Sequence, residues 1–290
     1  MAASCTEGID TGFVALGYAK VALLGVVQGI TELLPISSTA HMRIVPAFLG
    51  WPDPGSAFSA AMQMAALAAV ISYFWADVAE LTGGTLMAIL RGDGRSPYLR
   101  MTVGIVLGSI PIVIGGVLLA KRLNTCDSPL RSLWVIGISC VVMAIFLAIA
   151  EIFARHERDI TEVRLRDAFY IGLAQLGALI PGVSRSGSTL TAALWLGFQR
   201  DEAARYSFLL GIPAIIGAGG KEMWELYHAH ISAEAWQVLG VGLFMASVSA
   251  FIAIWGLMRM LERFSTWPFV LYRGAMGAYL IYAAYYGLMS

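Results

Sequence analysis

Two similar stretches of sequence, half a chain apart, decide how this protein folds. Residues 25–50 read GVVQGITELLPISSTAHMRIVPAFLG, and residues 172–197 read GLAQLGALIPGVSRSGSTLTAALWLG. Each is an apolar run through a glutamine, a proline and a serine-rich turn to a shorter run that ends in Leu-Gly. Matched positions lie 146 or 147 residues apart in a chain of 290 residues. The spacing predicts an internal repeat, with chance similarity between two small-residue turns as the alternative.

The composition around these stretches indicates that lipid is the solvent. Of all residues, 58% are hydrophobic and 13% are charged, and the mean hydropathy is +0.74. Soluble domains are about half apolar and about a quarter charged. The formal net charge is zero, which gives no indication of a nucleic-acid partner. The sequence therefore predicts a single all-α polytopic membrane domain over residues 1–290.

Six apolar segments approach the roughly 20 residues that a helix needs to cross a bilayer. They are residues 57–76, 99–120, 132–154, 203–219, 236–257 and 269–289. Four less regular segments flank the two serine-rich turns, namely residues 13–34, 39–51, 167–180 and 188–198. The last two are too short to span. Each pair is therefore expected to form a re-entrant helix-loop-helix hairpin, which returns to the side from which it entered.

Each half of the chain, about residues 12–154 and 165–290, then holds one hairpin and three spanning helices. An odd number of spans inverts the second half relative to the first, so the two hairpins enter from opposite faces. Inverted repeats with broken helices bring polar backbone together near the membrane midplane. We therefore expect the two turns to build one site.

Basic residues in the connecting segments predict the orientation. Eleven arginines are expected on one side: Arg91, Arg95, Arg100, Arg155, Arg158, Arg164, Arg166, Arg200, Arg205, Arg259 and Arg263. Four basic residues are expected on the other: Lys121, Arg122, Arg131 and Lys221. The richer side is predicted to be cytoplasmic. Both termini and the mouth of the first hairpin then lie outside.

The first turn is flanked by ionisable side chains, which are costly at membrane depth unless they serve a site. Gln28 and Glu32 lie four residues apart and face the same side of a helix. Pro35 ends that helix. His41 lies three residues after Ser38, on the same side of the helix that follows.

Hydroxyl groups gather where the second helix of this hairpin begins. Ser37, Ser38 and Thr39 offer side-chain oxygens and backbone N–H groups there. The N-terminus of a helix attracts anions, and phosphate is the usual one. These residues are therefore candidates for binding phosphate, although capping and packing are the commoner use of such turns in membrane helices.

The second turn combines one guanidinium with four hydroxyls. They belong to Ser184, Arg185, Ser186, Ser188 and Thr189. Small residues let backbone amides approach a ligand, and guanidinium offers a planar fork for phosphate oxygens. A structural ion pair with a carboxylate is the alternative use of the arginine. With Glu32 and His41 on the facing hairpin, the combination predicts a site for a phosphorylated ligand.

At these two motifs the sequence resembles the undecaprenyl-diphosphate phosphatase family, also called bacitracin-resistance proteins. Residues 28–41 and 181–189 carry the resemblance, and weaker likeness runs through residues 58–74, 206–213 and 268–273. The resemblance implies six spanning helices, two re-entrant hairpins and an outward-facing site in the bacterial plasma (inner) membrane. It also implies hydrolysis of a C55 isoprenyl diphosphate to the monophosphate with a divalent cation, which recycles the lipid carrier for cell-wall synthesis.

The resemblance also implies roles for individual residues. Glu32 matches the essential second acidic residue of the family's first motif. Ser38 matches the serine proposed as the nucleophile, and His41 matches the family's histidine. The phosphate-binding turn is matched by Ser184, Arg185 and Thr189. Two positions depart from the pattern: Gln28 stands where many members have Glu, so it cannot be an anionic metal ligand, and Ala40 stands where Gly is usual.

These residues predict a phosphoryl-transfer mechanism. Mg²⁺ or Ca²⁺, held partly by Glu32, bridges diphosphate oxygens, and Arg185 stabilises the transferring group. Ser38, activated by His41, attacks the terminal phosphorus; in the competing version, His41 activates a water and Ser38 binds phosphate.

Two other functions remain as alternatives. A lipid-phosphate flippase or transporter would use the same inverted repeat, whereas a membrane scaffold would leave the ionisable residues unexplained. The sequence leaves the oligomeric state open, with a homodimer among the alternatives. Lys20 and Arg273, in or near apolar stretches, are expected to extend to the membrane surface.

Overall fold

The computed structural model describes residues 12–123 and 132–288, and over these residues all named elements are helices. A 3-10 helix, η1 (Gly12–Leu16), leads into the first α-helix. The α-helices are α1 (Gly17–Leu33), α2 (Ser38–Phe48), α3 (Ser56–Tyr73), α4 (Trp75–Arg91), α5 (Pro97–Leu123), α6 (Leu133–Phe153), α7 (Leu165–Leu176), α8 (Arg185–Trp195), α9 (Arg200–His228), α10 (Ala233–Leu261) and α11 (Trp267–Tyr285). The all-α prediction is confirmed.

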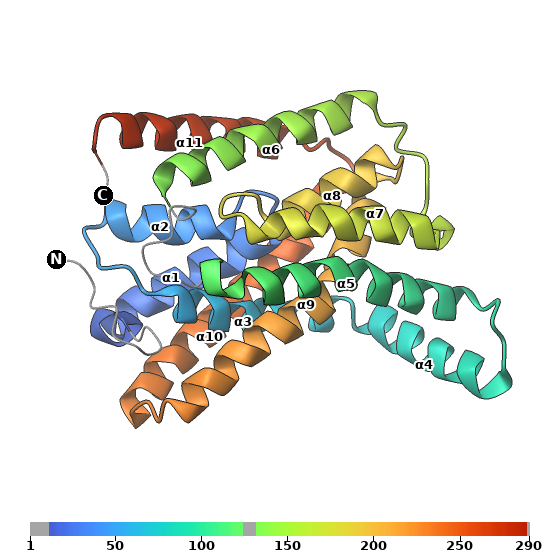
Figure 1. The fold of residues 1–290 in the computed structure, drawn as a ribbon, viewed down its shortest axis with the longest axis horizontal. Coiled ribbons are helices and arrows are strands. Elements are labelled where there is room, and N and C mark those ends of the chain that lie inside the picture. Colours follow the sequence, from blue (N-terminus) through green and yellow to red (C-terminus); the bar gives the residue numbers. More distant parts are fainter. Residues whose placement is uncertain (1–11, 124–131, 289–290) are drawn as a thin grey trace.

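Two helical hairpins, α1–α2 and α7–α8, enter the molecule from opposite ends, and their turns lie near its middle (Figure 1). Close backbone contacts hold them in place. A Cβ atom on Gly25 of α1 would lie 2.5 Å from the carbonyl oxygen of Gly242 in α10. A Cβ atom on Gly172 of α7 would lie 2.3 Å from the carbonyl oxygen of Gly108 in α5. The matched glycines thus let each hairpin pack tightly on a helix from the other half.

The two turns share an unusual backbone conformation. Ser37 and Ser184 have φ angles of 73° and 66°, a region that residues with a side chain seldom occupy. The Ser37 hydroxyl accepts a hydrogen bond from Ala40 N at 3.4 Å, and that of Ser184 accepts one from Gly187 N at 3.2 Å. Each serine therefore caps the helix that follows it. Such strained residues concentrate at ligand and active sites.

Several helices have the length and apolar composition to cross a membrane. Within the described ranges, four segments meet both requirements: Gly12–Leu33, Pro97–Leu119, Leu133–Phe153 and Ala233–Leu261. The bent pair Phe58–Tyr73 and Trp75–Arg91 makes a fifth if it is one broken span. This agrees with a multi-pass membrane protein, and three of the predicted spans (99–120, 132–154 and 236–257) are among these segments.

The other predicted segments are not confirmed. The segments predicted at 203–219 and 269–289 lie in α9 and α11. Neither helix is among the described segments that meet both the length and the hydropathy requirement. α9 begins with charged residues, and α11 contains Arg273. Residues 13–34, expected to form a re-entrant arm, are long enough to span because η1 extends α1.

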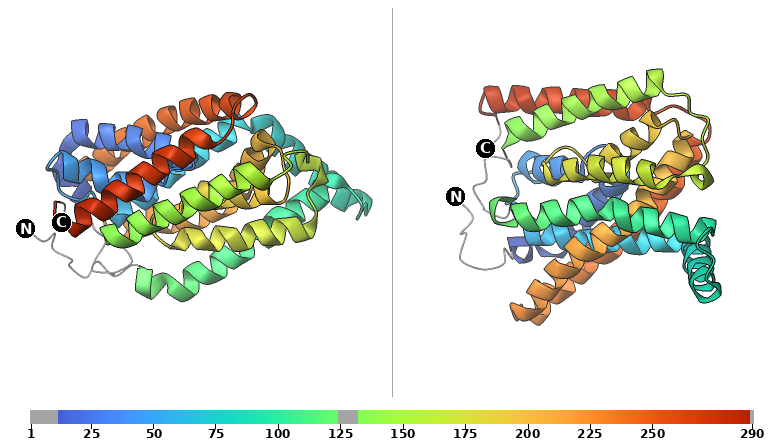
Figure 2. Two further views of the ribbon diagram at one scale, coloured as in Figure 1. Left: turned by 90° about the horizontal axis from the view of Figure 1, so that it is seen from above. Right: turned by 45° about the vertical axis from the view of Figure 1, so that its right-hand side comes forward.

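The predicted span 57–76 ends early. The chain turns by 78° after Tyr73 and continues as α4, which the sequence analysis did not predict (Figure 2). Phe74, at the bend, is 4% exposed and packs against Phe208 of α9. Asp77, just beyond the bend in α4, forms an ion pair with Arg205 of α9. Contacts with α9, remote in sequence, therefore set the bend.

The arginine-rich connections lie together at one end of the molecule (Figure 1). Arg158 donates to the Leu196 carbonyl oxygen at 2.8 Å, and Arg100 donates to the Thr161 carbonyl oxygen at 3.0 Å. Glu151, at the end of α6, accepts hydrogen bonds from Arg200 and from Thr266. The start of α1 and the end of α11 lie at the opposite end (Figure 1).

The orientation prediction also names residues that the structure does not describe. Arg131 and Ser290, and the side chains of Lys121 and Arg122, lie outside the described residues.

Candidate active site

Glu32 joins the two helices of the first hairpin. It lies in the last turn of α1 and is 8% exposed. Its Oε2 atom accepts hydrogen bonds from Gln28 Nε2 at 3.0 Å and from Ser38 Oγ at 2.7 Å. A buried carboxylate is costly without such partners. The local i,i+4 pairing on α1 and the first hydroxyl of α2 therefore keep Glu32 in one orientation.

The second turn reaches the same carboxylate. Arg185, the first residue of α8, places its Nη2 atom 3.5 Å from Glu32 Oε1. The Ser186 hydroxyl donates to the carbonyl oxygens of Glu32, at 3.2 Å, and Leu34, at 3.3 Å. A Cβ atom on Gly211 of α9 would lie 1.7 Å from Arg185 Nη1, so glycine leaves room for the guanidinium in this position and a larger residue would displace it. Residues from the two hairpins thus meet at Glu32.

His41 lies three residues after Ser38, but its ring contacts other groups. Its Nδ1 atom lies 2.8 Å from the Ser37 carbonyl oxygen, which can only accept, so Nδ1 carries the proton. In the neutral ring, Nε2 then accepts from the Tyr272 hydroxyl at 2.6 Å. The Ser38 hydroxyl donates to Glu32 instead. Among the described residues, no hydrogen bond joins Ser38 to His41 as expected, and the acceptor of the Ser38 hydroxyl is the Glu32 carboxylate.

Arg273 is a residue whose role the sequence analysis missed. Its guanidinium donates from Nη1 to the Pro35 carbonyl oxygen at 3.1 Å, and from Nη2 to the carbonyl oxygens of Gly182, at 2.6 Å, and Val183, at 2.5 Å. The side chain is 1% exposed, so the prediction that it extends to the membrane surface is wrong. It joins the two turns instead. The sequence feature that could have revealed this role is an arginine within an otherwise apolar helix.

The remaining hydroxyls of the second turn point in different directions. Thr189 is fully buried; its hydroxyl donates to the Arg185 carbonyl oxygen at 2.8 Å and contacts the Ser207 hydroxyl on α9. The Ser188 hydroxyl donates to the Arg185 carbonyl oxygen at 3.0 Å. The Ser184 hydroxyl faces that of Ser186 at 3.2 Å. Thr189 and Ser188 therefore support the position of the turn.

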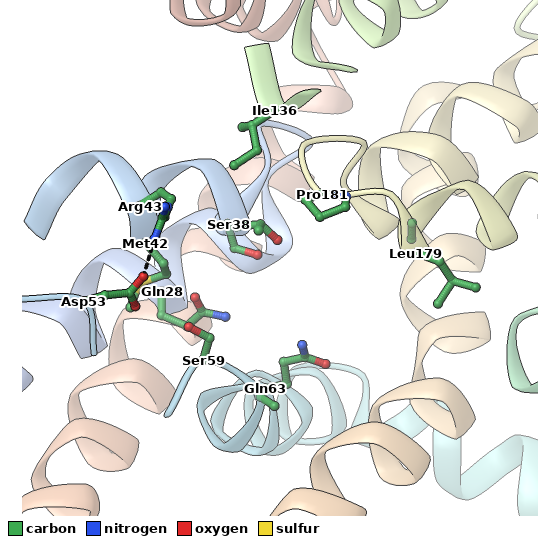
Figure 3. Close-up of a pocket in the computed structure, with 13 residues that line it drawn as sticks. Gln28, Ser38, Met42, Arg43, Asp53, Ser59, Gln63, Ile136, Leu179 and Pro181 are labelled. Atoms are coloured by element: carbon green, nitrogen blue, oxygen red, sulfur yellow. Dashed lines mark hydrogen bonds and ion pairs between the residues drawn. The ribbon is translucent and has the colours of Figure 1, made fainter. Parts of the chain in front are cut away.

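A pocket of about 270 Å³ opens beside Ser38 (Figure 3). Polar side chains from the first half line it: Gln28, Ser38, Thr39, Arg43, Asp53, Ser59 and Gln63. Ile136, Leu179 and Pro181 form an apolar part of the wall. Arg43 and Asp53 form an ion pair at 2.5 Å. That pair and the two polar residues of α3, Ser59 and Gln63, lie outside the motifs at the turns, so the sequence did not point to them.

The side-chain oxygens at the site fit a hard cation but supply only part of its ligands. In residues 12–123 and 132–288, no three acidic, histidine or cysteine side chains form a metal cluster. Glu32 supplies one carboxylate, and the buried Oε1 atom of Gln28 has no hydrogen-bond partner among the residues that the structure describes. Carboxylate, amide and hydroxyl oxygens suit Mg²⁺ and Ca²⁺, and Mg²⁺ is commonly held by one carboxylate plus substrate phosphates. Gln28 cannot be an anionic ligand, but its amide oxygen can therefore be a neutral one.

Comparisons with known proteins agree with the resemblance seen in the two motifs. The family described as "Bacitracin resistance protein BacA" matches residues 21–279. A protein named undecaprenyl-diphosphatase 2 from Mesorhizobium japonicum is 68% identical over 88% of this chain and 96% of its own length. An undecaprenyl-diphosphatase from Synechococcus elongatus is 48% identical over 92% of this chain and 93% of its own length. The chain therefore belongs to the bacitracin resistance protein BacA family.

Proposed function

We propose that this chain hydrolyses undecaprenyl diphosphate to undecaprenyl phosphate and inorganic phosphate, which recycles the lipid carrier for cell-wall synthesis. The relatives at 68% and 48% identity carry that activity in their names. The observation that carries the proposal is the meeting of Glu32, Ser38 and Arg185 from two hairpins beside a polar pocket. A nucleophile, a proton acceptor and a phosphate-binding cation are the groups that phosphoryl transfer requires.

The geometry supports a mechanism through Ser38. The terminal phosphoryl group lies in the pocket, with Thr39 and the N-terminal amides of α2 binding its oxygens. Ser38 Oγ attacks phosphorus, its proton passes to Glu32 Oε2 at 2.7 Å, and the bond to undecaprenyl phosphate breaks. Water then attacks the phosphoserine, which releases inorganic phosphate and restores the hydroxyl. In the competing route a water takes the place of Ser38 as nucleophile, and Ser38 binds phosphate.

Positive charge must balance the diphosphate in this setting. Arg185 reaches the site from the second turn and stabilises the equatorial oxygens of the transferring group. A bound Mg²⁺ or Ca²⁺ would supply further charge to the diphosphate oxygens. Glu32 and the amide oxygen of Gln28 are the groups that would hold it. His41 is anchored to Ser37 and Tyr272 and holds the start of α2 in place.

The membrane arrangement is the second part of the proposal. Six spans and two re-entrant hairpins in an inverted repeat, with halves at about 12–154 and 165–290, are supported by the matched turns and matched glycines. The first arm has the length of a span, yet α1 ends at the central turn (Figure 1). The arginine-rich end would face the cytoplasm. Both termini and the pocket mouth would then face the outside of the plasma (inner) membrane.

Fusions at the C-terminus test this orientation. Alkaline phosphatase joined after Ser290 should be active, and a fluorescent protein joined there should stay dark. The reverse pair of results would overturn the outward-facing pocket.

Phosphate release tests the activity. Wild-type protein purified in detergent should release inorganic phosphate from undecaprenyl diphosphate, and the Glu32→Gln variant should not. Glu157→Gln, an exposed carboxylate at the arginine-rich end, is the matched control and should keep full activity. A lipid-phosphate flippase, the second candidate, would release no phosphate. Inverted repeats with broken helices favour that candidate.

The molar mass of the same preparation tests whether the protein is a homodimer.

A further inference from the structure

The wall of the polar pocket carries one positive charge, that of Arg43. Among the residues that the structure describes, the lining holds a single guanidinium, from Arg43, and a single carboxylate, from Asp53. Arg185 pairs with Glu32 at the turns, and neither of these two side chains lines the pocket. An anion inside the pocket therefore has the Arg43 guanidinium as the cation on its wall.

The position of Arg43 follows from the spacing of residues on α2. Arg43 lies four residues after Thr39, so both side chains stand on the same side of the helix and line the same pocket. Four residues advance a helix by about 6 Å. The guanidinium thus stands one helical turn beyond the hydroxyls of Ser38 and Thr39. These hydroxyls surround the terminal phosphoryl group in the proposed reaction.

The pocket has a charged wall and an apolar wall on opposite sides. In Figure 3, Arg43 and Asp53 lie at one side of the drawn residues, and Leu179 lies at the other, beyond Pro181. Leu179, Pro181 and Ile136 form the apolar part of the lining. The wall that carries Arg43 therefore suits the more highly charged end of a diphosphate lipid, which is its terminal phosphoryl group.

The ion pair of Arg43 leaves the guanidinium available for exchange. Its Nη1 atom lies 2.5 Å from Asp53 Oδ2, and the two side chains are 35% and 32% exposed. Water screens a pair that is this exposed, so the pair contributes little to stability. Among the described residues, Arg43 donates a side-chain hydrogen bond to Asp53 alone, although a guanidinium has five N–H groups. The remaining donors suit the oxygens of a phosphate group.

Asp53 stays near Arg43 through a second contact. Its Oδ1 atom accepts a hydrogen bond from Gly55 N at 2.8 Å, within the connection between α2 and α3. This bond does not depend on the guanidinium. A phosphate bound to Arg43 would therefore lie close to a negative charge that the backbone holds in place. The carboxylate competes with phosphate for the guanidinium and weakens its binding.

We propose that Arg43 binds the terminal phosphoryl group of the substrate and then the released phosphate, and that Asp53 pairs with the guanidinium between turnovers. The proposal rests on the proposed phosphatase function. Arg43 lies away from the Ser38–Glu32 contact, so it binds substrate and transition state alike and acts on KM more than on kcat. Asp53 keeps the affinity for inorganic phosphate low, which lets the product leave.

The experiment breaks the same ion pair from its two ends. Arg43→Gln removes the cation, whereas Asp53→Asn removes the competing anion and leaves the cation in place. An ion pair that only fastens α2 to the next connection would give both variants changes in the same direction. Lys221→Gln, which breaks the exposed pair between Lys221 and Glu225 of α9 outside the pocket, is the matched control.

Three quantities are measured in one detergent: KM and kcat for undecaprenyl diphosphate, and the inhibition constant of inorganic phosphate. Arg43→Gln should raise KM and the inhibition constant by about tenfold, roughly the effect of one charge-assisted hydrogen bond, with a much smaller change in kcat. Asp53→Asn should lower both constants by about threefold, because the competing ion pair is weak. Lys221→Gln should change none of the three.

Opposite shifts in the two variants are the result that supports the proposal. A KM that rises in both variants, or in neither, would overturn it, and so would an inhibition constant that Arg43→Gln leaves unchanged. If Arg43→Gln does not fold, Asp53→Asn alone decides, since it must lower both constants. A wild-type protein that releases no phosphate from undecaprenyl diphosphate would overturn the proposed function itself.

Discussion

The two serine-rich turns have the same backbone shape and opposite chemistry. Ser37 and Ser184 share a positive φ angle and a capping hydroxyl. Beside the first turn stands a carboxylate, Glu32, and at the second a guanidinium, Arg185. Two turns with the same side chains would bring like charges together in a low dielectric. Because their side chains differ, two similar turns bring a carboxylate and a guanidinium together at one site.

The largest expected effect removes the charge of the first turn. Glu32→Gln should nearly abolish phosphate release, since the amide cannot accept the Ser38 proton and carries no charge for a cation. Gln28→Ala should reduce turnover only in part, because Gln28 contributes a hydrogen bond and a neutral oxygen. Turnover of both variants in one detergent is the measurement. Equal and complete loss in two folded variants would contradict the division of roles.

The second effect removes the charge of the second turn. Arg185→Ala should lower kcat by roughly a hundredfold, about 3 kcal/mol of transition-state stabilisation. Arg185→Lys should recover little of it, because lysine lacks the bidentate fork. The double variant with Ser38→Ala should lose much less than the product of the two single losses, as expected of groups that act as a unit. Multiplicative losses would mean that the two turns do not share a transition state.

Gly211→Ala offers a test that keeps the charge of Arg185. A methyl group at this position would lie 1.7 Å from Arg185 Nη1, so the guanidinium must move. Turnover should fall by about tenfold or more, since small displacements of positioning groups cost rate steeply. Gly217→Ala in the same helix, where a Cβ atom meets nothing within 4 Å, is the control and should leave turnover unchanged.

The third effect loosens the connection between the turns. Arg273→Met removes the donor that serves three buried carbonyl oxygens, each worth about 1–3 kcal/mol when left unsatisfied. The melting temperature in detergent should fall, and turnover should fall with it. Arg273→Lys should restore part of the stability but less of the activity, because one ammonium group cannot hold both turns in register. Restoration of both to the same degree would show that Arg273 acts through stability alone.

The smallest effect concerns the imidazole near the first turn. Tyr272→Phe removes the donor to His41 Nε2 while keeping the stacked ring. One neutral hydrogen bond is worth about 1 kcal/mol, so turnover should fall by roughly fivefold. His41→Ala should cost more, since it also removes the contact with Ser37. A loss in Tyr272→Phe as large as in Glu32→Gln would give His41 the direct chemical role that its contacts do not support.

The sequence predicted that the chain is helical better than it predicted where the helices bend and end. The segment 57–76 reads as one span, but its bend after Tyr73 depends on Phe208 and Arg205 of α9, which lie more than 120 residues away. No proline or glycine marks the bend. Hydropathy alone therefore placed the helix but not its end.

The sequence by itself determined the solvent, the helical class and the two turns, because apolar length, proline and serine act through their near neighbours in the chain. It also singled out the polar side chains of the two turns, but neither the role of Arg273 nor the contribution of Ser59 and Gln63. Only the tertiary structure decided their partners: Ser38 with Glu32, His41 with Tyr272, and Arg273 with both turns. The last two contacts join residues 231 and 238 positions apart. Hydrogen bonds form over about 3 Å in space, and sequence spacing carries that distance only within one helix or turn.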